Sequence, residues 1–141
     1  MKTILLLLVG FAPLVLRAAD SPDPCSLLTA SQIESTFGKL KGAPKPDVGL
    51  QKERECRYEN EDGNFLVLRL YSSDRWGLKK GMNSENNPTE LPGLGDEAFL
   101  VKHGTDKEIY IRKKDWILEI DSSADSEKVK ALAGPAAAKL P

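Results

Sequence analysis

Alternating apolar and polar positions in the middle of the chain predict a β-hairpin that turns at an Asp-Gly pair ending in Gly63. A two-residue turn there would place leucines opposite charged side chains on one face of the hairpin. A three-residue turn instead pairs Tyr58 with Leu66 and Cys56 with Leu68, which gathers apolar side chains on one face. We therefore expect the three-residue turn, with Gly63 in the left-handed backbone conformation that glycine adopts easily.

The opposite face of this hairpin is too apolar for ordinary solvated surface. Either a helix covers it or a partner binds there. Aromatic residues and arginine dominate the energetics of protein interfaces. A tryptophan soon after the hairpin, flanked by cationic residues, adds to this pattern, although a tryptophan more often packs its ring against a sheet. The candidate contact residues are Phe65, Val67, Arg69, Tyr71 and Trp76.

Three further strands are expected at about 97–103, 108–112 and 116–121, because apolar alternation resumes there between turn residues. A three-residue first turn at 104–106 and a two-residue second turn at 114–115 bring their apolar side chains to one face. The expected pairs are Val101 with Ile109, Phe99 with Ile111, Ile111 with Leu118, and Ile109 with Ile120.

Helix signals flank these strands. Thr29 and Gln32 have the spacing of a capping box, and Gly38 is a typical stop for the helix between them. A second helix is expected from near Ser126, with Pro135 kinking or breaking it. The side chains expected to face the sheet are Ile33 and Phe37 in the first helix, and Val129, Leu132, Ala136 and Leu140 in the second.

The remaining segments are richer in glycine, proline and polar residues. We expect a loop over 39–50 that contains at most one short edge strand, a turn of helix over 75–80, and a long loop over 81–92. The sequence therefore predicts an α+β fold, with an antiparallel sheet of about five strands and N-terminal and C-terminal helices packed on it.

Residues 1–18 have the pattern of a secretory signal peptide, with a positive start, an apolar run and a small-residue cleavage site. The run is too short to span a bilayer, so we expect no stable membrane insertion after cleavage. Residues 19–24 form an extended leader, and 25–141 a single α+β domain. The protein is thus expected to be secreted or periplasmic.

Charge and cysteine content refine this picture. Without Lys2 and Arg17, 18 of the 20 basic residues remain against 21 acidic ones, a net charge of −3, which argues against general nucleic-acid binding. An even number of cysteines in a small exported domain favours a disulfide, so we pair Cys25 with Cys56. Closing a loop of this length stabilises a fold by about 3–4 kcal/mol.

The sequence contains no catalytic signature. The single histidine, His103, falls at an ordinary hairpin position, and one histidine with two oxidised cysteines does not make a zinc site. The carboxylate pairs Asp121 with Asp125 and Asp96 with Glu97 lack calcium-loop spacing, so we interpret them as caps and turn residues. No catalytic residue, metal or cofactor is predicted.

Three segments, 23–29 opening a helix, 56–58 on the following strand and 91–99 leading into the later strands, carry a family resemblance. Together they resemble a family of small exported bacterial envelope proteins, many of them actinobacterial lipoproteins, known only as a domain of unknown function. The resemblance implies an α+β domain with an antiparallel sheet, a Cys25–Cys56 disulfide and a bacterial origin. It supplies no catalytic residues. This chain lacks the lipidated cysteine near the cleavage site, so no lipid anchor is expected.

We therefore expect a non-enzymatic binding or interaction module of the bacterial cell envelope, whose partner is another envelope protein or a small ligand. The alternatives are a small-ligand carrier or hydrolase with a pocket, or a protein inhibitor that inserts the loop 81–92 into its target.

Overall fold

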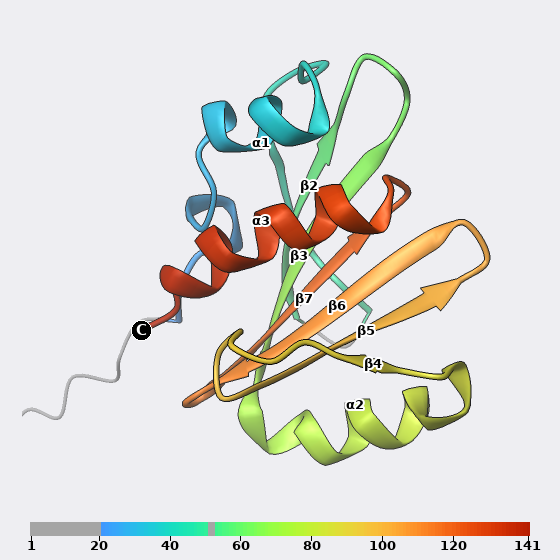
Figure 1. Ribbon diagram of the computed structural model, residues 1–141. Helices are drawn as coiled ribbons and strands as arrows, with labels where there is room; N and C mark the ends of the chain where they lie inside the picture. The colour runs from blue at the N-terminus through green and yellow to red at the C-terminus, as the bar shows by residue number, and fades with distance from the viewer. Residues whose placement is uncertain (1–20, 51–52) are drawn as a thin grey trace, which may run out of the picture.

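The computed structural model describes residues 21–50 and 53–141; the predicted signal peptide and the first two leader residues lie outside this part of the chain. The described residues form a seven-stranded antiparallel sheet in the order β1-β2-β3-β7-β6-β5-β4 with three α-helices (Figure 1). The α+β class and the antiparallel sheet are thus confirmed.

The strands are β1 (Lys45–Val48), β2 (Arg54–Glu59), β3 (Phe65–Ser72), β4 (Thr89–Glu90), β5 (Glu97–His103), β6 (Asp106–Lys113) and β7 (Trp116–Ser122). The α-helices are α1 (Ala30–Phe37), α2 (Trp76–Asn83) and α3 (Ser126–Ala138). Single 3₁₀ turns form η1 (Pro24–Ser26), η2 (Ser73–Arg75) and η3 (Ser84–Asn86).

The predicted strand number was too low by two, because neither edge strand was counted, although β1 lies in the segment 39–50 where at most one short edge strand was expected. β1 contains Pro46 and is exposed at all four positions, and β4 has only two residues, both exposed. Short, exposed edge strands do not need the apolar alternation on which the prediction depended.

The central hairpin has the predicted register. Tyr58 pairs with Leu66 and Cys56 with Leu68, and Gly63 has a positive φ of 82°. The three-residue turn is therefore confirmed, and the hairpin presents one apolar face to the core.

The predicted register of β5 against β6 was wrong by one residue. Leu100, not Val101, pairs with Ile109, because the turn has two residues and begins at Gly104 with φ 63°. The β6–β7 turn has the predicted two residues, and both predicted pairs across it are confirmed. Since side chains alternate between faces, Phe99 and Val101 lie on the opposite face of the sheet from Ile109.

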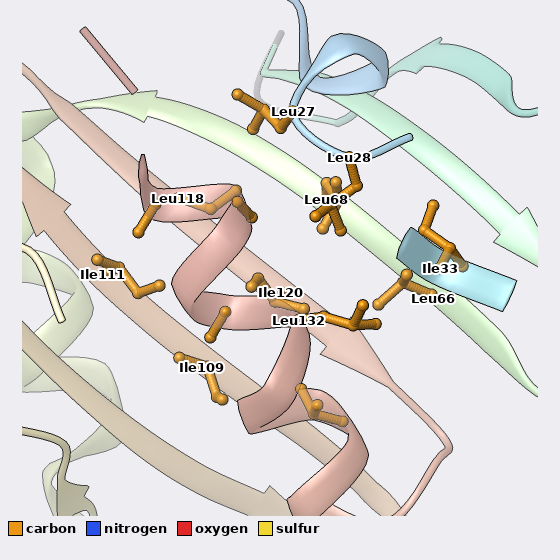
Figure 2. Close-up of a cluster of buried hydrophobic side chains, with 14 of the residues drawn as sticks. Leu27, Leu28, Ile33, Leu66, Leu68, Ile109, Ile111, Leu118, Ile120 and Leu132 are labelled. Carbon is orange, nitrogen blue, oxygen red and sulfur yellow. The ribbon is translucent and has the colours of Figure 1, made fainter. Parts of the chain in front are cut away.

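Helices α1 and α3, with η1, cover the first face of the sheet (Figure 1). Figure 2 shows Leu132 of α3 among the isoleucines and leucines of β3, β6 and β7. Asp125 caps α3, and Pro135 lies within the helix without breaking it. The predicted core residues are buried, namely Ile33, Phe37, Val129, Leu132, Ala136 and Leu140.

The N-terminal segment is tied to this face by the predicted disulfide. Cys25 of η1 is bonded to Cys56 of β2, and the predicted capping box of α1 is formed between Thr29 and Gln32. A disulfide is typical of proteins folded in an oxidising compartment, which agrees with an extracellular location. In residues 21–50 and 53–141, no helix is both long enough and apolar enough to span a membrane.

Helix α2 packs on the other face of the sheet (Figure 1). It extends beyond the expected turn over 75–80 and takes up the start of the expected loop over 81–92, which η3 and β4 then shorten further. Trp76 of α2 packs on Phe99, with ring centres 5.4 Å apart, and Phe99 stacks on Tyr110 at 5.0 Å. A helix therefore covers part of this second face, and the rest of it carries charged side chains.

Candidate ligand-binding groove

A row of side chains crosses the second face from β2 to β5. Its members are direct register partners on neighbouring strands, in the order Glu55, Arg69, Glu119, Tyr110 and Phe99. α2 packs on the aromatic end of this row. The polar side chains of the row thus lie together on the part of the second face that α2 does not cover.

Arg69 is the centre of the charged part of the row. Its Nε donates to Glu55 at 2.9 Å, and its Nη1 donates to Glu119 at 2.6 Å and to Asp121 at 3.3 Å. Burial opposes the positive charge, but Glu119 and the other carboxylates outweigh it and raise the pKa of the guanidinium. Arg69 is therefore held in one orientation by three anionic partners.

Glu119 joins this arginine to α2. Its side chain is 5% exposed, and its second oxygen accepts a hydrogen bond from Lys79 Nζ at 2.9 Å. Burial disfavours the charged carboxylate, yet Lys79 and Arg69 together hold the pKa of Glu119 below its usual value. Glu119 is thus an ionised carboxylate between two cations.

The ammonium of Lys79 also lies against two aromatic rings. Its Nζ is 3.7 Å from the centre of the Tyr71 ring and 5.4 Å from that of Tyr110. Burial, and then the charge of Glu119, raise the pKa of both phenols. The rings therefore stay neutral and stabilise the cation through their negative faces.

Asp121 behaves differently from Glu119. Burial raises the pKa of Asp121 to about 6, because Arg69 only partly offsets it and the carboxylates of Glu108 and Glu119 add repulsion. The net charge of the group formed by Arg69, Glu119 and Asp121 consequently changes between mildly acidic and neutral pH.

Beside these groups the surface forms a groove of about 470 Å³. We call it the Arg69 groove; its described lining residues are Asp47, Val48, Gly49, Leu50, Glu53, Glu55, Arg69, Tyr71, Lys79, Tyr110 and Glu119. Its volume falls in the range of about 300–1,000 Å³ that is typical of small-ligand sites.

The five predicted contact residues do not share one open surface. Arg69 and Tyr71 line the groove, although Tyr71 is buried beneath Lys79. Val67 is fully buried, and Phe65 is half-buried with the Arg57 guanidinium 5.0 Å from its ring centre. Trp76, the first residue of α2, is buried against Phe99, and its Nε1 donates to Glu97 at 3.0 Å. The predicted apolar residues are thus mostly buried by contacts within the chain and do not form a free contact surface.

Glu55, Lys79 and Glu119 were not predicted as site residues. One signal pointed to Glu119: it is a charged residue between Leu118 and Ile120 in a largely apolar strand, and alternation places it on the second face. No comparable signal exists for Lys79, because its position depends on how α2 packs against the sheet.

The other candidate groups are separate from the groove or from one another. The side chain of His103 is 40% exposed, with its Nε2 3.5 Å from Glu108. Asp125 caps α3, Asp96 accepts from the backbone N–H of Lys114, and Glu97 pairs with Arg112 and Lys80. Within the described residues, no three His, Cys, Asp or Glu side chains are grouped so as to hold a metal ion.

Comparisons with known proteins give little beyond this geometry. No protein-family model and no curated protein matches the chain. Among solved structures, the crystal structure of a GTP binding regulator from Thermotoga maritima is similar, with a TM-score of 0.49 and 15% sequence identity over 82% of this chain and 92% of that chain. A likeness at this level says nothing about function.

Proposed function

We propose that this protein is an exported, non-enzymatic binding or interaction module of the bacterial cell envelope, and that it binds its partner in the Arg69 groove. One observation carries the proposal: the groove exposes the edge of a rigid, partly buried ion-pair network instead of an apolar surface. Such a network often stabilises a fold no better than apolar packing would. Fixed polar groups beside an open groove are what recognition requires.

The electrostatics of the groove support binding over catalysis. Arg69 is engaged by three carboxylates, and Glu119 by two cations. The raised pKa values of Tyr71 and Tyr110 keep both phenols protonated at neutral pH, so neither is an activated nucleophile. These side chains are suited to orienting a bound group.

The location is supported by two independent features. The disulfide between Cys25 and Cys56 requires an oxidising compartment to form and persist in most organisms. The predicted signal peptide over 1–18 supplies the export route, and the resemblance to bacterial envelope proteins agrees with it.

A small-ligand carrier is the second candidate, because the groove volume would also suit a small molecule. Native mass spectrometry of protein purified from its own host distinguishes the two functions. A carrier is expected to retain a small molecule at defined mass, whereas an interaction module is not.

A site-specific crosslinking experiment tests the proposed function. Leu50 lines the groove and is fully exposed, whereas Leu78 on α2 is also exposed but does not line the groove. A photoreactive phenylalanine analogue at Leu50, in protein exported by its host, is expected to give a defined adduct with an envelope protein. The same analogue at Leu78 serves as the matched control. No adduct at Leu50, or equal adducts at both positions, would contradict the proposal.

A further inference from the structure

The edge of the sheet is hollowed where the chain enters β1. The backbone N–H of Lys41 donates to Glu59 of β2 at 2.9 Å, and strand pairing resumes at Lys45. Between these two contacts, residues 42–44 lie opposite the single residue Tyr58, so the chain bows away from β2 as it does at a bulge. The space left is a pocket of about 300 Å³, at the lower end of the range typical of small-ligand sites. It shares no described lining residue with the Arg69 groove.

Two cations line this pocket without an anionic partner. Lys45 and Arg57 lie directly opposite each other on β1 and β2, a position in which like charges destabilise strand pairing. In the part of the chain that the structure describes, neither side chain forms an ion pair or a hydrogen bond. The one carboxylate among the described lining residues, Glu59, is already paired with Lys41 at 3.0 Å. An anion between the two unpaired cations would reduce their repulsion without breaking an internal pair.

Acidic residues nearby do not neutralise these two cations. Asp47 and Glu55 form the register pair two positions further along the same face. Glu55 accepts from Arg69 at 2.9 Å, and Asp47 accepts from the backbone N–H of Val48 at 2.8 Å. The undescribed residues 51–52 are glutamine and lysine, so they bring no acidic side chain. The positive charge of the two cations is therefore available to a ligand.

An aromatic ring supports the arginine of the pocket. The guanidinium carbon of Arg57 lies 5.0 Å from the centre of the ring of Phe65, which is one of the predicted contact residues. A guanidinium that lies over a ring keeps its in-plane N–H donors available. The hydrogen bond and the charge of Lys41, followed by the charges of Lys45 and Arg57, lower the pKa of Glu59. The three cations thus act on the same point of the pocket.

We propose that this pocket, which we call the Lys45–Arg57 pocket, binds a phosphate group carried by a small phosphate ester or by a lipid headgroup. A guanidinium presents paired N–H donors that match two phosphate oxygens, and an ammonium adds a compact charge. Cations from two strands suit a tetrahedral dianion better than a planar carboxylate, which a single arginine can satisfy. The site goes beyond the proposed function, because it requires neither the Arg69 groove nor a partner protein.

An NMR titration tests the chemistry of the ligand. Methyl phosphate is the probe and acetate is the control anion, each added to isotope-labelled, oxidised, full-length mature protein at constant low ionic strength. Methyl phosphate is expected to shift the amide signals of residues 41–45 and 57–59 saturably. It is expected to bind about fivefold more tightly than acetate, because it carries more charge and more acceptor oxygens.

Two charge-neutralising variants locate the binding. Arg57→Gln and Lys45→Gln are each expected to weaken binding of methyl phosphate by about fivefold. Lys45 is exposed, so its variant should fold normally even if the loss of Arg57 from the Phe65 ring disturbs β2. The matched control is Lys102→Gln, because Lys102 is an exposed strand residue opposite another lysine but does not line the pocket. This control is expected to change binding by less than about twofold, since distant exposed charges are screened.

Vesicles identify the source of the phosphate group. Cosedimentation with phosphatidylcholine vesicles that contain phosphatidic acid, lost in Arg57→Gln but kept in Lys102→Gln, would support the proposal with a lipid headgroup as the ligand. Binding of methyl phosphate without cosedimentation would support it with a free phosphate ester as the ligand.

Three results would overturn the proposal. They are the absence of saturable shifts with methyl phosphate, equal affinity for methyl phosphate and acetate, and equal effects of Lys45→Gln and Lys102→Gln on binding. The proposed function is judged separately by the adduct at Leu50, which does not depend on phosphate binding at the Lys45–Arg57 pocket.

Discussion

Lys79 of α2 and Glu119 of β7 form an ion pair of 2.9 Å in which the carboxylate is 5% exposed. The other oxygen of Glu119 accepts from Arg69 of β3 at 2.6 Å. One carboxylate therefore connects the helix on the second face to the central strands. The position of α2 beside the Arg69 groove depends on this connection as well as on the aromatic contacts of Trp76.

Replacing the carboxylate tests this dependence. Glu119→Gln keeps the side-chain shape but leaves Lys79 without its anionic partner in a mostly buried site. We expect the free energy of unfolding to fall by about 2–4 kcal/mol, because the buried charge that remains has lost its hydration and no longer has a partner to compensate for that loss. Urea unfolding measures the change, with Glu85→Gln on exposed η3 as the control. An equal midpoint for both variants would disprove this role.

The raised pKa of Asp121 should make the stability of the fold depend on pH with the opposite sign to that of a carboxylate in an ordinary ion pair. Burial raises its pKa to about 6 in the folded protein. The native state therefore keeps a proton that the unfolded chain releases at lower pH, and stability falls as pH rises from about 4 to 6. Asp121→Asn cannot titrate, so its advantage over the unmodified protein should grow by roughly 1–3 kcal/mol across this window.

Unfolding at several pH values between 4 and 7 measures that difference. The lowered pKa of Glu119 makes stability rise with pH, but it is present in both proteins and largely cancels from the comparison. A constant difference between the two proteins across this range would contradict the raised pKa of Asp121.

Strand register can be predicted from the sequence where only one face of a strand is buried. In β2, Arg57 and Glu59 alternate with Cys56 and Tyr58, so only one register against β3 gives an apolar face. β5 instead has four consecutive buried residues, 98–101, because α2 covers its second face. Alternation then contains no information about register, and the prediction there failed by one residue.

The candidate site shows the same limit. Arg69 and Tyr71 were found because the second face of the hairpin was unusually apolar for a solvated surface. The groove itself depends on the packing of α2 and on the short strand β1, neither of which has a strong pattern in the sequence. Contacts between distant segments, such as Lys79 with Glu119, become visible only in the folded chain.

The disulfide gives a prediction that does not depend on the groove. Cys25 and Cys56 are 31 residues apart, and closing a loop of this length stabilises the folded state by about 3–4 kcal/mol. The double variant Cys25→Ala and Cys56→Ala should lower the free energy of guanidinium unfolding by about this amount. A reducing agent should destabilise the unmodified protein but leave the variant unchanged. A reductant effect on both proteins would point to another cause.

Two glycines before β5 give a matched test of backbone packing. Gly93 and Gly95 both have positive φ, of 86° and 59°. A Cβ on Gly95 would clash with the carbonyl oxygen of Arg112, whereas a Cβ on Gly93 would have no described atom within 4 Å apart from its own residue and its two chain neighbours. The same carbonyl accepts from the backbone N–H of Asp96 at 2.8 Å, so it cannot move freely.

Gly93→Ala should therefore destabilise the fold by about 1 kcal/mol, the usual strain of a left-handed residue with a side chain. Gly95→Ala adds a backbone clash to that strain and should cost at least about 3 kcal/mol. It should also disturb the adjoining β6–β7 turn, where the Asp96 carboxylate accepts from the Lys114 N–H. Chemical unfolding of both variants measures the two costs. Equal costs would mean that Gly95 is required only for its backbone conformation and not for the close approach of the segment before β5 to β6.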